Sequence, residues 1–135
     1  MELLTITLAG VPVAKGRARI TRNGTFTPNK TRRYESTLRL AAREAMLGRK
    51  MFDCALHVSV IVHVPIPASW SKRKKNSANI GTLLPCTKPD LDNYIKIATD
   101  ALNGVVYPDD NQVVDVLASK RYSEHPRITI TISTV

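Results

Sequence analysis

Hydrophobic and polar residues alternate along several short segments of the chain. The alternation is strictest near the end, in RITITISTV (127–135), and it recurs in LLTITLA (3–9). A period of two is typical of a half-buried strand. Residues 54–64 (CALHVSVIVHV) and 113–124 (VVDVLASKRYSE) are rich in β-branched residues and predict two further strands, the former at the centre of a sheet. The last two strands in the chain are expected to pair as an antiparallel hairpin.

Two other segments repeat apolar residues at the helical spacing of three and four. They cover residues 31–47 and 91–102, and the second ends at Asn103-Gly104, a common helix terminator. Each segment predicts an amphipathic helix with one face in the core. The apolar positions are Tyr34, Leu38, Ala41 and Ala45 in the first helix, and Leu91, Ile95, Ala98 and Leu102 in the second.

The remaining segments read as turns and loops. Asn23-Gly24 is a tight-turn signal that predicts a small hairpin within residues 17–27. Residues 65–88 contain three prolines and many polar residues, and they predict a long loop. The order of elements is strand, helix, strand, helix, strand, strand. It predicts a single domain over residues 1–135, of α+β class, with two main helices on a four-stranded mixed sheet.

The excess of basic residues indicates that the domain has a polyanionic partner. The chain has 20 Lys and Arg against 11 Asp and Glu, a formal net charge of +9. Such a balance favours nucleic acid as the partner. A membrane is not expected, because no apolar run approaches the roughly 20 residues of a spanning helix. The opening MELLTITLAG also lacks the pattern of a signal peptide, so we expect a cytoplasmic protein.

The acidic residues are not spread evenly. Six of the eleven fall in the segment KPDLDNYIKIATDALNGVVYPDDNQVVD (88–115), which holds only two lysines. Acids on a surface that binds nucleic acid repel phosphates, so their concentration in one segment indicates a local task. The six are Asp90, Asp92, Asp100, Asp109, Asp110 and Asp115.

Two of these aspartates open the second helix. Asp90 precedes it in an extended Pro-Asp step, and Asp92 shares a face with Lys96 four residues later. Several carboxylates beside a lysine suit Mg²⁺, a hard ion that prefers oxygen ligands. The alternative is structural, because aspartate is also a common helix cap and Asp-Asp-Asn is ordinary turn chemistry.

The same segment resembles the signature of the RusA family of Holliday junction resolvases. That signature runs D-x-D-N-x-x-K, then D-A-L, then D-D-x-Q-V, and the N-terminal PVAKGRARITRNGTFTPNKTRRYE resembles the basic start of many members. The similarity extends over nearly the whole chain. The matching residues are Asp90, Asp92, Asn93, Lys96, Asp100, Ala101, Leu102, Asp109, Asp110, Gln112 and Val113.

The resemblance implies a homodimeric endonuclease that cuts four-way DNA junctions by paired nicks. It implies a divalent metal, Mg²⁺ or Mn²⁺, whose activated water attacks the phosphodiester. The metal-binding carboxylates would be Asp90, Asp92 and Asp110, and Lys96 would be the catalytic lysine. The role of Asp109 stays open. Asp100 is expected to face away from Asp92 and Lys96 and to be structural, and Asp115 is either a supporting group or a polar surface residue.

Basic residues outside the acidic segment are candidates for phosphate contacts. Trp70, beside the lysine-rich run 72–75, could stack on an exposed base, or it could anchor a solvated loop to the core. The candidate DNA-binding residues are Lys15, Arg17, Arg19, Arg22, Arg32, Arg33, Trp70, Lys72, Arg73, Lys74 and Lys75.

Two rival functions fit the same residues. A non-catalytic basic DNA-binding protein would use the acids only to cap a helix and shape a turn. A metal nuclease for another branched nucleic acid would keep the site and change the substrate. Metal-dependent cleavage separates the first rival from a nuclease, and competition among substrates separates the second.

Overall fold

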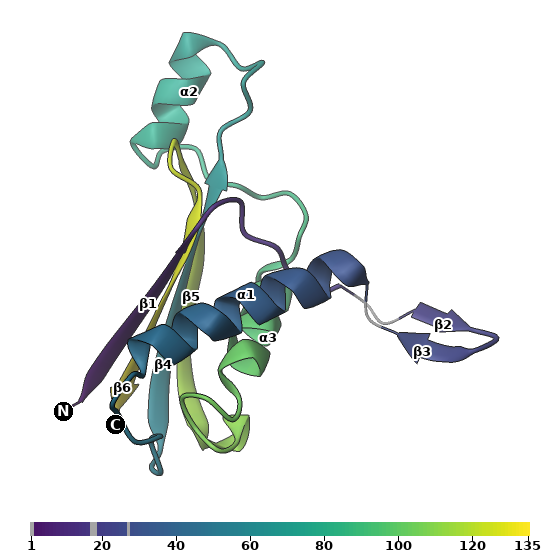
Figure 1. Ribbon diagram of the computed structural model, residues 1–135. Helices are drawn as coiled ribbons and strands as arrows, with labels where there is room; N and C mark the ends of the chain where they lie inside the picture. The colour runs from purple at the N-terminus through teal and green to yellow at the C-terminus, as the bar shows by residue number, and fades with distance from the viewer. Residues whose placement is uncertain (1, 17–18, 27) are drawn as a thin grey trace.

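The sheet at the centre of the molecule has four strands and is covered by helices on one face (Figure 1). The computed structural model describes residues 2–16, 19–26 and 28–135. The strand order is β1-β6-β4-β5, and a separate two-stranded hairpin pairs β2 with β3. The elements are β1 (Leu3–Ala9), β2 (Arg19–Thr21), β3 (Gly24–Phe26), α1 (Asn29–Ala45), β4 (Leu56–Pro65), α2 (Lys72–Asn79), α3 (Leu91–Leu102), the 3-10 turn η1 (Asp110–Gln112), β5 (Val113–Ser123) and β6 (Arg127–Thr134).

The core lies between this sheet and two helices. Alternate residues of β4, such as Val58 and Val60, are fully buried on the helix side, as are Ile128 and Ile130 of β6. Helices α1 and α3 pack against each other and cover that face (Figure 1). In β4 and β6, the alternation of apolar residues therefore corresponds to the face that each strand buries.

The buried face of α3 is turned slightly from the predicted one. Tyr94, Ile97 and Ala101 are buried together with Ala98 and Leu102, whereas the predicted positions Leu91 and Ile95 are only half-buried. The face that carries the acidic residues is therefore opposite the core.

Helix α3 connects two parallel neighbours, β4 and β5. Parallel strands need a crossover of this kind, because a tight turn joins only antiparallel strands. The helix runs back along the sheet, so its first residues lie near the carboxyl ends of β4 and β5 (Figure 1). The other pairs, β1 with β6 and β4 with β6, are antiparallel. The predicted α+β fold with a four-stranded mixed sheet and a central β4 is confirmed.

The predicted hairpin of the last two strands is wrong. β5 and β6 follow each other in sequence, but β4 lies between them and pairs with both. The reason is burial: the strand with the most apolar inner face takes the interior position, and β5, which is largely exposed, takes an edge.

The predicted loop 65–88 contains a helix. Helix α2 spans Lys72–Asn79, and the Ser71 side chain caps it by accepting a hydrogen bond from the Lys74 amide (3.2 Å). Its basic residues hide any apolar stripe, which is why periodicity missed it. The predicted hairpin of residues 17–27 is confirmed where the structure describes it, as β2 and β3. Within the described residues, no helix has both the length and the apolar character needed to cross a bilayer.

The packing of α1 makes a direct prediction about stability. Leu38 is fully buried between the helix and the sheet, whereas Leu40, two residues later, is 57% exposed. Leu38→Ala should lower the free energy of unfolding by about 2–5 kcal/mol, and Leu40→Ala should change it by no more than about 0.5 kcal/mol. Urea unfolding of both variants measures the difference. Equal effects would show that α1 does not pack as described.

Candidate functional site

The start of α3 presents two carboxylates to solvent. Asp90 occupies the N-cap position with extended backbone (φ −69°, ψ 148°), and Asp92 lies in the first helical turn. Both side chains are exposed, and the Asp90 carboxylate makes no capping hydrogen bond to the helix. Within the described residues, neither carboxylate takes part in a hydrogen bond or ion pair. The extended backbone at Asp90 agrees with the Pro-Asp entry that the sequence predicts.

A lysine from the sheet fixes the chain just before these carboxylates. The Lys120 ammonium donates to the carbonyl oxygens of Thr87 (2.9 Å) and Pro89 (3.0 Å). Lys120 lies on β5 opposite Val62, on the side of the sheet that the helices cover. Sequence reasoning missed it, although a lysine at an inward position of an alternating strand is a visible signal. Its two bonds hold the segment from which Asp90 projects.

Lys96 and Asp100 form an ion pair along α3, with 3.0 Å between Lys96 Nζ and Asp100 Oδ1. The prediction that Asp100 faces away from Lys96 is therefore wrong. Four residues advance an α-helix by little more than one turn, which places the two side chains on one face. Asp92, Lys96 and Asp100 follow this spacing and form a charged stripe on the helix.

The stripe continues into the N-terminal segment through Lys15. Its ammonium lies 3.1 Å from Asp100 Oδ2 and also pairs with Glu35 of α1. The Lys15 amide donates to the Asn93 carbonyl (2.9 Å). Burial alone would lower the pKa of Lys15, but the hydrogen bonds and charges of Glu35 and Asp100 outweigh it and raise that pKa. Lys15, predicted as a phosphate contact, thus ties three segments together.

The second pair of aspartates lies in the turn η1. Asp109 caps this turn by accepting a hydrogen bond from the Asn111 amide (3.2 Å), and the Asp109 amide donates to Gln112 Oε1 (3.2 Å). Gln112 also donates to the carbonyls of Phe52 (2.9 Å) and Cys54 (3.1 Å). Asp109 is thereby engaged as a cap, whereas the half-buried Asp110 has no hydrogen bond or ion pair among the described residues.

Tyr107 shows where Asp110 lies along α3. The Tyr107 hydroxyl donates to the Thr99 carbonyl (2.8 Å) in the second half of that helix. Burial raises the pKa of Tyr107, and the charges of Asp110 and Asp100 raise it further. The Tyr107 bond and the contact between α3 and η1 place this turn beside the second half of the helix, whereas Asp90 and Asp92 lie at its start.

The carboxylate oxygens of Asp90 and Asp92 are the kind of ligand that a hard divalent cation prefers, but they do not form a complete set of metal ligands. Among the residues that the structure describes, no three His, Cys, Asp or Glu side chains are grouped to hold a metal ion. Mg²⁺ usually keeps several waters and needs only one or two carboxylates when a substrate phosphate supplies further ligands. The free oxygens of Asp90 and Asp92 fit that mode. The three-carboxylate set that includes Asp110 stays a prediction.

Apart from Lys15, the predicted DNA contacts lie on or beside two projections of the fold. The hairpin β2–β3 projects beyond the start of α1, and α2 projects beyond the carboxyl end of β4 (Figure 1). Arg22, Arg32 and Arg33 are exposed near the first projection, and Arg32 also donates to Asn29 (2.9 Å). Arg17 lies outside the described residues, and only the backbone of Arg19 is described.

The second projection carries the lysine-rich run. Lys72, Arg73 and Lys74 are exposed on the first turn of α2, with Lys75 half-buried. The Lys74 ammonium lies 4.0 Å from the centre of the Trp70 ring. That ring also meets Tyr122 of β5 edge-on, with centroids 5.2 Å apart. These contacts are those of an anchor that fastens α2 to the sheet.

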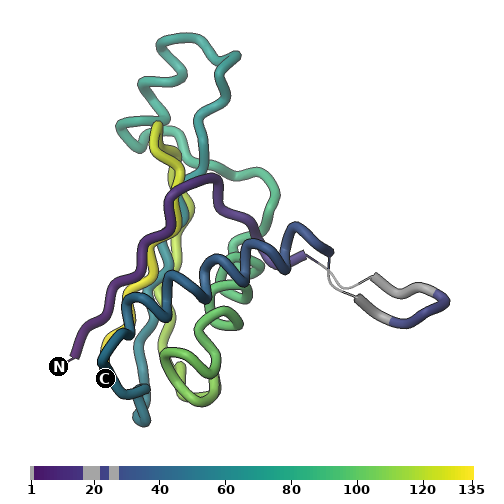
Figure 2. Tube along the Cα trace, in the orientation of Figure 1, coloured from purple at the N-terminus to yellow at the C-terminus, as the bar shows by residue number. Residues whose placement is uncertain are grey.

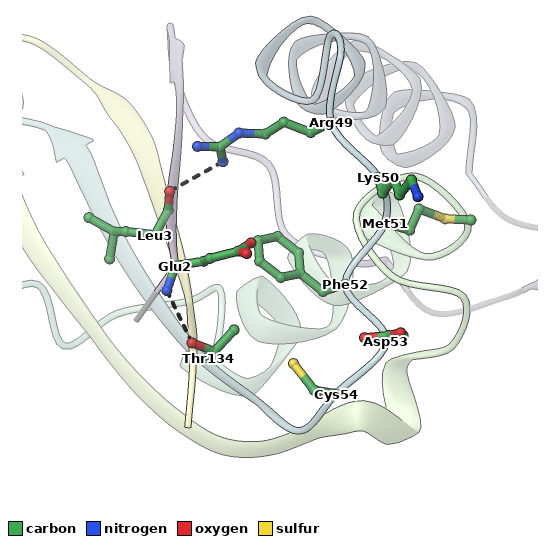
Figure 3. Close-up of a pocket in the computed structure, with 9 residues that line it drawn as sticks. All are labelled: Glu2, Leu3, Arg49, Lys50, Met51, Phe52, Asp53, Cys54 and Thr134. Atoms are coloured by element: carbon green, nitrogen blue, oxygen red, sulfur yellow. Dashed lines mark hydrogen bonds between the residues drawn. The ribbon is translucent and has the colours of Figure 1, made fainter.

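A second surface feature is a cavity of about 680 Å³ where β1 begins and β6 ends (Figure 3). Two of its lining residues, Phe52 and Cys54, accept the hydrogen bonds from Gln112 of η1. Its lining mixes the acids Glu2 and Asp53 with the bases Arg49 and Lys50, and the Arg49 guanidinium donates to the Leu3 carbonyl (3.2 Å). None of the predicted site residues lines it, and its charges balance. It is a reference surface for control substitutions.

The sequence is similar to a known protein family over most of its length. A family model described as "Endodeoxyribonuclease RusA" matches residues 9–133. A curated protein of Bacillus subtilis (strain 168), described as "Uncharacterized protein YqaN", is 40% identical over 141 aligned positions that cover 100% of this chain and 99% of the relative. The match covers the whole acidic segment and both projections, and the resemblance seen in the sequence is confirmed.

The contacts of Lys120 predict its effect on the segment before α3. Lys120→Met keeps much of the side-chain length and removes both bonds to the carbonyls of Thr87 and Pro89. Amide hydrogen exchange across residues 86–93 should then accelerate by about tenfold, since hydrogen bonds to charged groups contribute about 1.5–3 kcal/mol. Lys50→Met, at an exposed loop position, is the matched control. Unchanged exchange in Lys120→Met would remove Lys120 from this role.

Proposed function

Because the chain belongs to the endodeoxyribonuclease RusA family, we propose that it is a Mg²⁺-dependent enzyme that resolves four-way DNA junctions by paired nicks. The family makes the chain a DNA endonuclease, a hydrolase that acts on Holliday junctions. The two free carboxylates at the start of α3, inside a basic protein, are the observation that carries the metal-dependent mechanism. Mn²⁺ is the alternative ion, and a cytoplasmic location remains a prediction.

In this proposal Asp90 and Asp92 would hold the metal, with waters and the phosphate to be cut as its further ligands. Bound Mg²⁺ would supply Lewis-acid polarisation of the phosphate and favour ionisation of the attacking water. The oxygen of that water attacks phosphorus and the water gives up a proton to solvent; the bond to the leaving sugar oxygen breaks, and that oxygen takes up a proton from solvent. Asp110 is included in the proposal because it matches the family motif, and the Asp110→Asn variant described below tests whether it binds the metal.

Lys96 stabilises the negative charge that builds up on the phosphate. Its side chain is 59% exposed and lies one turn after Asp92 on the same face of α3. Asp100 orients the Lys96 ammonium, and Lys15 in turn holds Asp100. A charge aimed in advance at the transition state costs no reorganisation during the reaction.

Binding of the DNA arms falls to the basic projections. The β2–β3 hairpin and α2 project in different directions from the part of the fold that contains α3 (Figure 1), and Arg22 of the hairpin and the first turn of α2 are basic and exposed. Contacts to phosphates position a duplex without reading its sequence.

Two opposed cuts need two copies of the site, so we propose a homodimer related by twofold symmetry. Edge strand β5 is the surface proposed for the second copy. It ends the sheet on one side, and Val114 and Leu117 on it are 63% and 65% exposed. An edge strand with exposed apolar side chains is a template for pairing with another chain.

The dimer proposal predicts a change of mass. Leu117→Glu should give a monomer near 14.9 kDa by light scattering at micromolar concentration, and the wild type should give about twice that mass. Leu47→Glu is the matched control, because Leu47 is 87% exposed after α1 and away from β5. A monomeric wild type would contradict the dimer, and a dimeric Leu117→Glu would move the interface elsewhere.

Cleavage of a synthetic four-way junction tests the nuclease mechanism. The wild type should cut in Mg²⁺ and not in EDTA, whereas Asp90→Asn and Asp92→Asn should each lower kcat at least 100-fold, because each loses an anionic ligand. Asp53→Asn, an exposed carboxylate in the cavity of Figure 3, should cut like the wild type. Junction binding by fluorescence anisotropy should survive in all three variants.

Two outcomes would contradict the mechanism. Binding without cleavage in either Mg²⁺ or Mn²⁺ would favour the non-catalytic DNA-binding alternative. Faster cleavage of flaps or RNA than of the junction would favour the other branched substrate. Asp110→Asn is a further variant in the same assay. A loss of kcat as large as that of Asp92→Asn would include Asp110 in the metal site, and wild-type cleavage would exclude it.

A further inference from the structure

A cavity of about 690 Å³ opens next to the metal-binding carboxylates of the proposed function. It lies at the carboxyl ends of β4 and β5, where Val64 and Tyr122 line it, and its rim includes Pro89, the residue before Asp90. Figure 2 shows the segment that follows β1 passing beside the chain that leads into α3, and this segment closes the opposite side. A molecule in the cavity would therefore be adjacent to the site of cleavage.

The walls of this cavity are rigid and apolar. Proline has a fixed φ and no amide donor, so a wall of prolines keeps its shape and offers a flat apolar surface. The segment after β1 is also fixed, because the Gly16 amide donates to the hydroxyl of Thr31 (3.1 Å), so close that a Cβ on Gly16 would lie 2.8 Å from the same oxygen. Six of the eight prolines of the chain line the cavity: Pro12, Pro28, Pro65, Pro67, Pro85 and Pro89.

The charged residues that line the cavity are all lysines. Its lining residues include four lysines and no aspartate or glutamate. Lys15 and Lys120 are engaged in the contacts described above, whereas Lys30 and Lys88 are exposed and make no hydrogen bond or ion pair among the described residues. An apolar interior with free ammonium groups at its rim suits a ligand that has a flat apolar part and an anionic part.

We propose that this cavity binds one unstacked nucleotide of the DNA strand that is cut. The base would lie against the proline walls, and the flanking phosphates would face Lys30 and Lys88. The volume is that of a pocket for a single small ligand and excludes a double helix. The inference rests on the proposed function, because the occupant is a nucleotide next to the scissile phosphate.

Such a pocket gives a physical reason for a preference for branched DNA. Moving a base out of an intact duplex costs its stacking and pairing, and that cost is smallest where the base is already unpaired or unstacked. Nucleotides at a branch point have lost part of their stacking. The cavity therefore favours a junction over a plain duplex without reading any sequence.

Fluorescence of 2-aminopurine tests this pocket directly. The base is placed at successive positions around the branch point of a synthetic junction and mixed with the full-length wild type in EDTA, so that no strand is cut. A rise of several-fold is expected at one position beside the cleavage site, and none in a duplex of the same sequence. Binding is followed in the same samples by anisotropy.

Substitutions that fill the cavity with a large side chain test whether the fluorescence rise depends on it. Val11→Trp and Thr87→Trp place bulk at two exposed positions of the lining, and each should reduce the rise at least threefold while the junction stays bound. Met51→Trp adds the same side chain to the other cavity and should behave as the wild type (Figure 3). Circular dichroism identifies a tryptophan variant that fails to fold. The remaining tryptophan variant then tests the pocket.

The outcomes separate this inference from the nuclease proposal. Junction binding with no rise at any position, or a wild-type rise in the folded tryptophan variants, overturns the pocket. A rise without cleavage in Mg²⁺ supports the pocket and overturns the nuclease mechanism. A protein that binds no junction at all overturns both.

Discussion

The burial of one face of α3 is the constraint on which the rest of the structure depends. Tyr94, Ile97 and Ala101 enter the core between α1 and the sheet. Once that face is buried, the helical period leaves Asp92 and Lys96 on the opposite side. The apolar residues of this helix thus decide where its charged residues can act. The crossover from β4 to β5 then brings the start of the helix to the carboxyl ends of both strands.

Two lysines that no motif marks connect the charged stripe to the fold. Lys120 binds the carbonyls of the segment before α3, and Lys15 binds Asp100 and Glu35. Each lysine therefore neutralises or orients polar groups close to the carboxylates without occupying their oxygens. Asp90 and Asp92 stay free of protein partners among the described residues. This arrangement agrees with an acidic site inside a basic protein, because its anionic oxygens remain available to a cation.

Much of this could be predicted from sequence, and the failures have physical causes. Alternation located β1 and β6, the β-branched residues located β4 and β5, and the apolar character of β4 placed it at the centre. Neighbours in the sheet were harder: β5 and β6 are adjacent in sequence, yet both pair with β4. Helix α2 was missed because its charged residues have no apolar period. Lys15, the second partner of Asp100, and the carbonyls that Lys120 binds come from distant segments, which sequence spacing does not reveal. The Lys96–Asp100 pair, in contrast, follows from the spacing of four residues within α3.

The central claim is that a divalent cation binds at the start of α3, and paramagnetic broadening by Mn²⁺ tests it most directly. In a ¹H–¹⁵N spectrum of the wild type titrated with Mn²⁺, the amide signals of residues 90–93 should broaden first, and Asp92→Asn should remove that effect. Excess Mg²⁺ should restore the signals. Broadening centred on another acidic group, or broadening that persists unchanged in Asp92→Asn, would contradict the account.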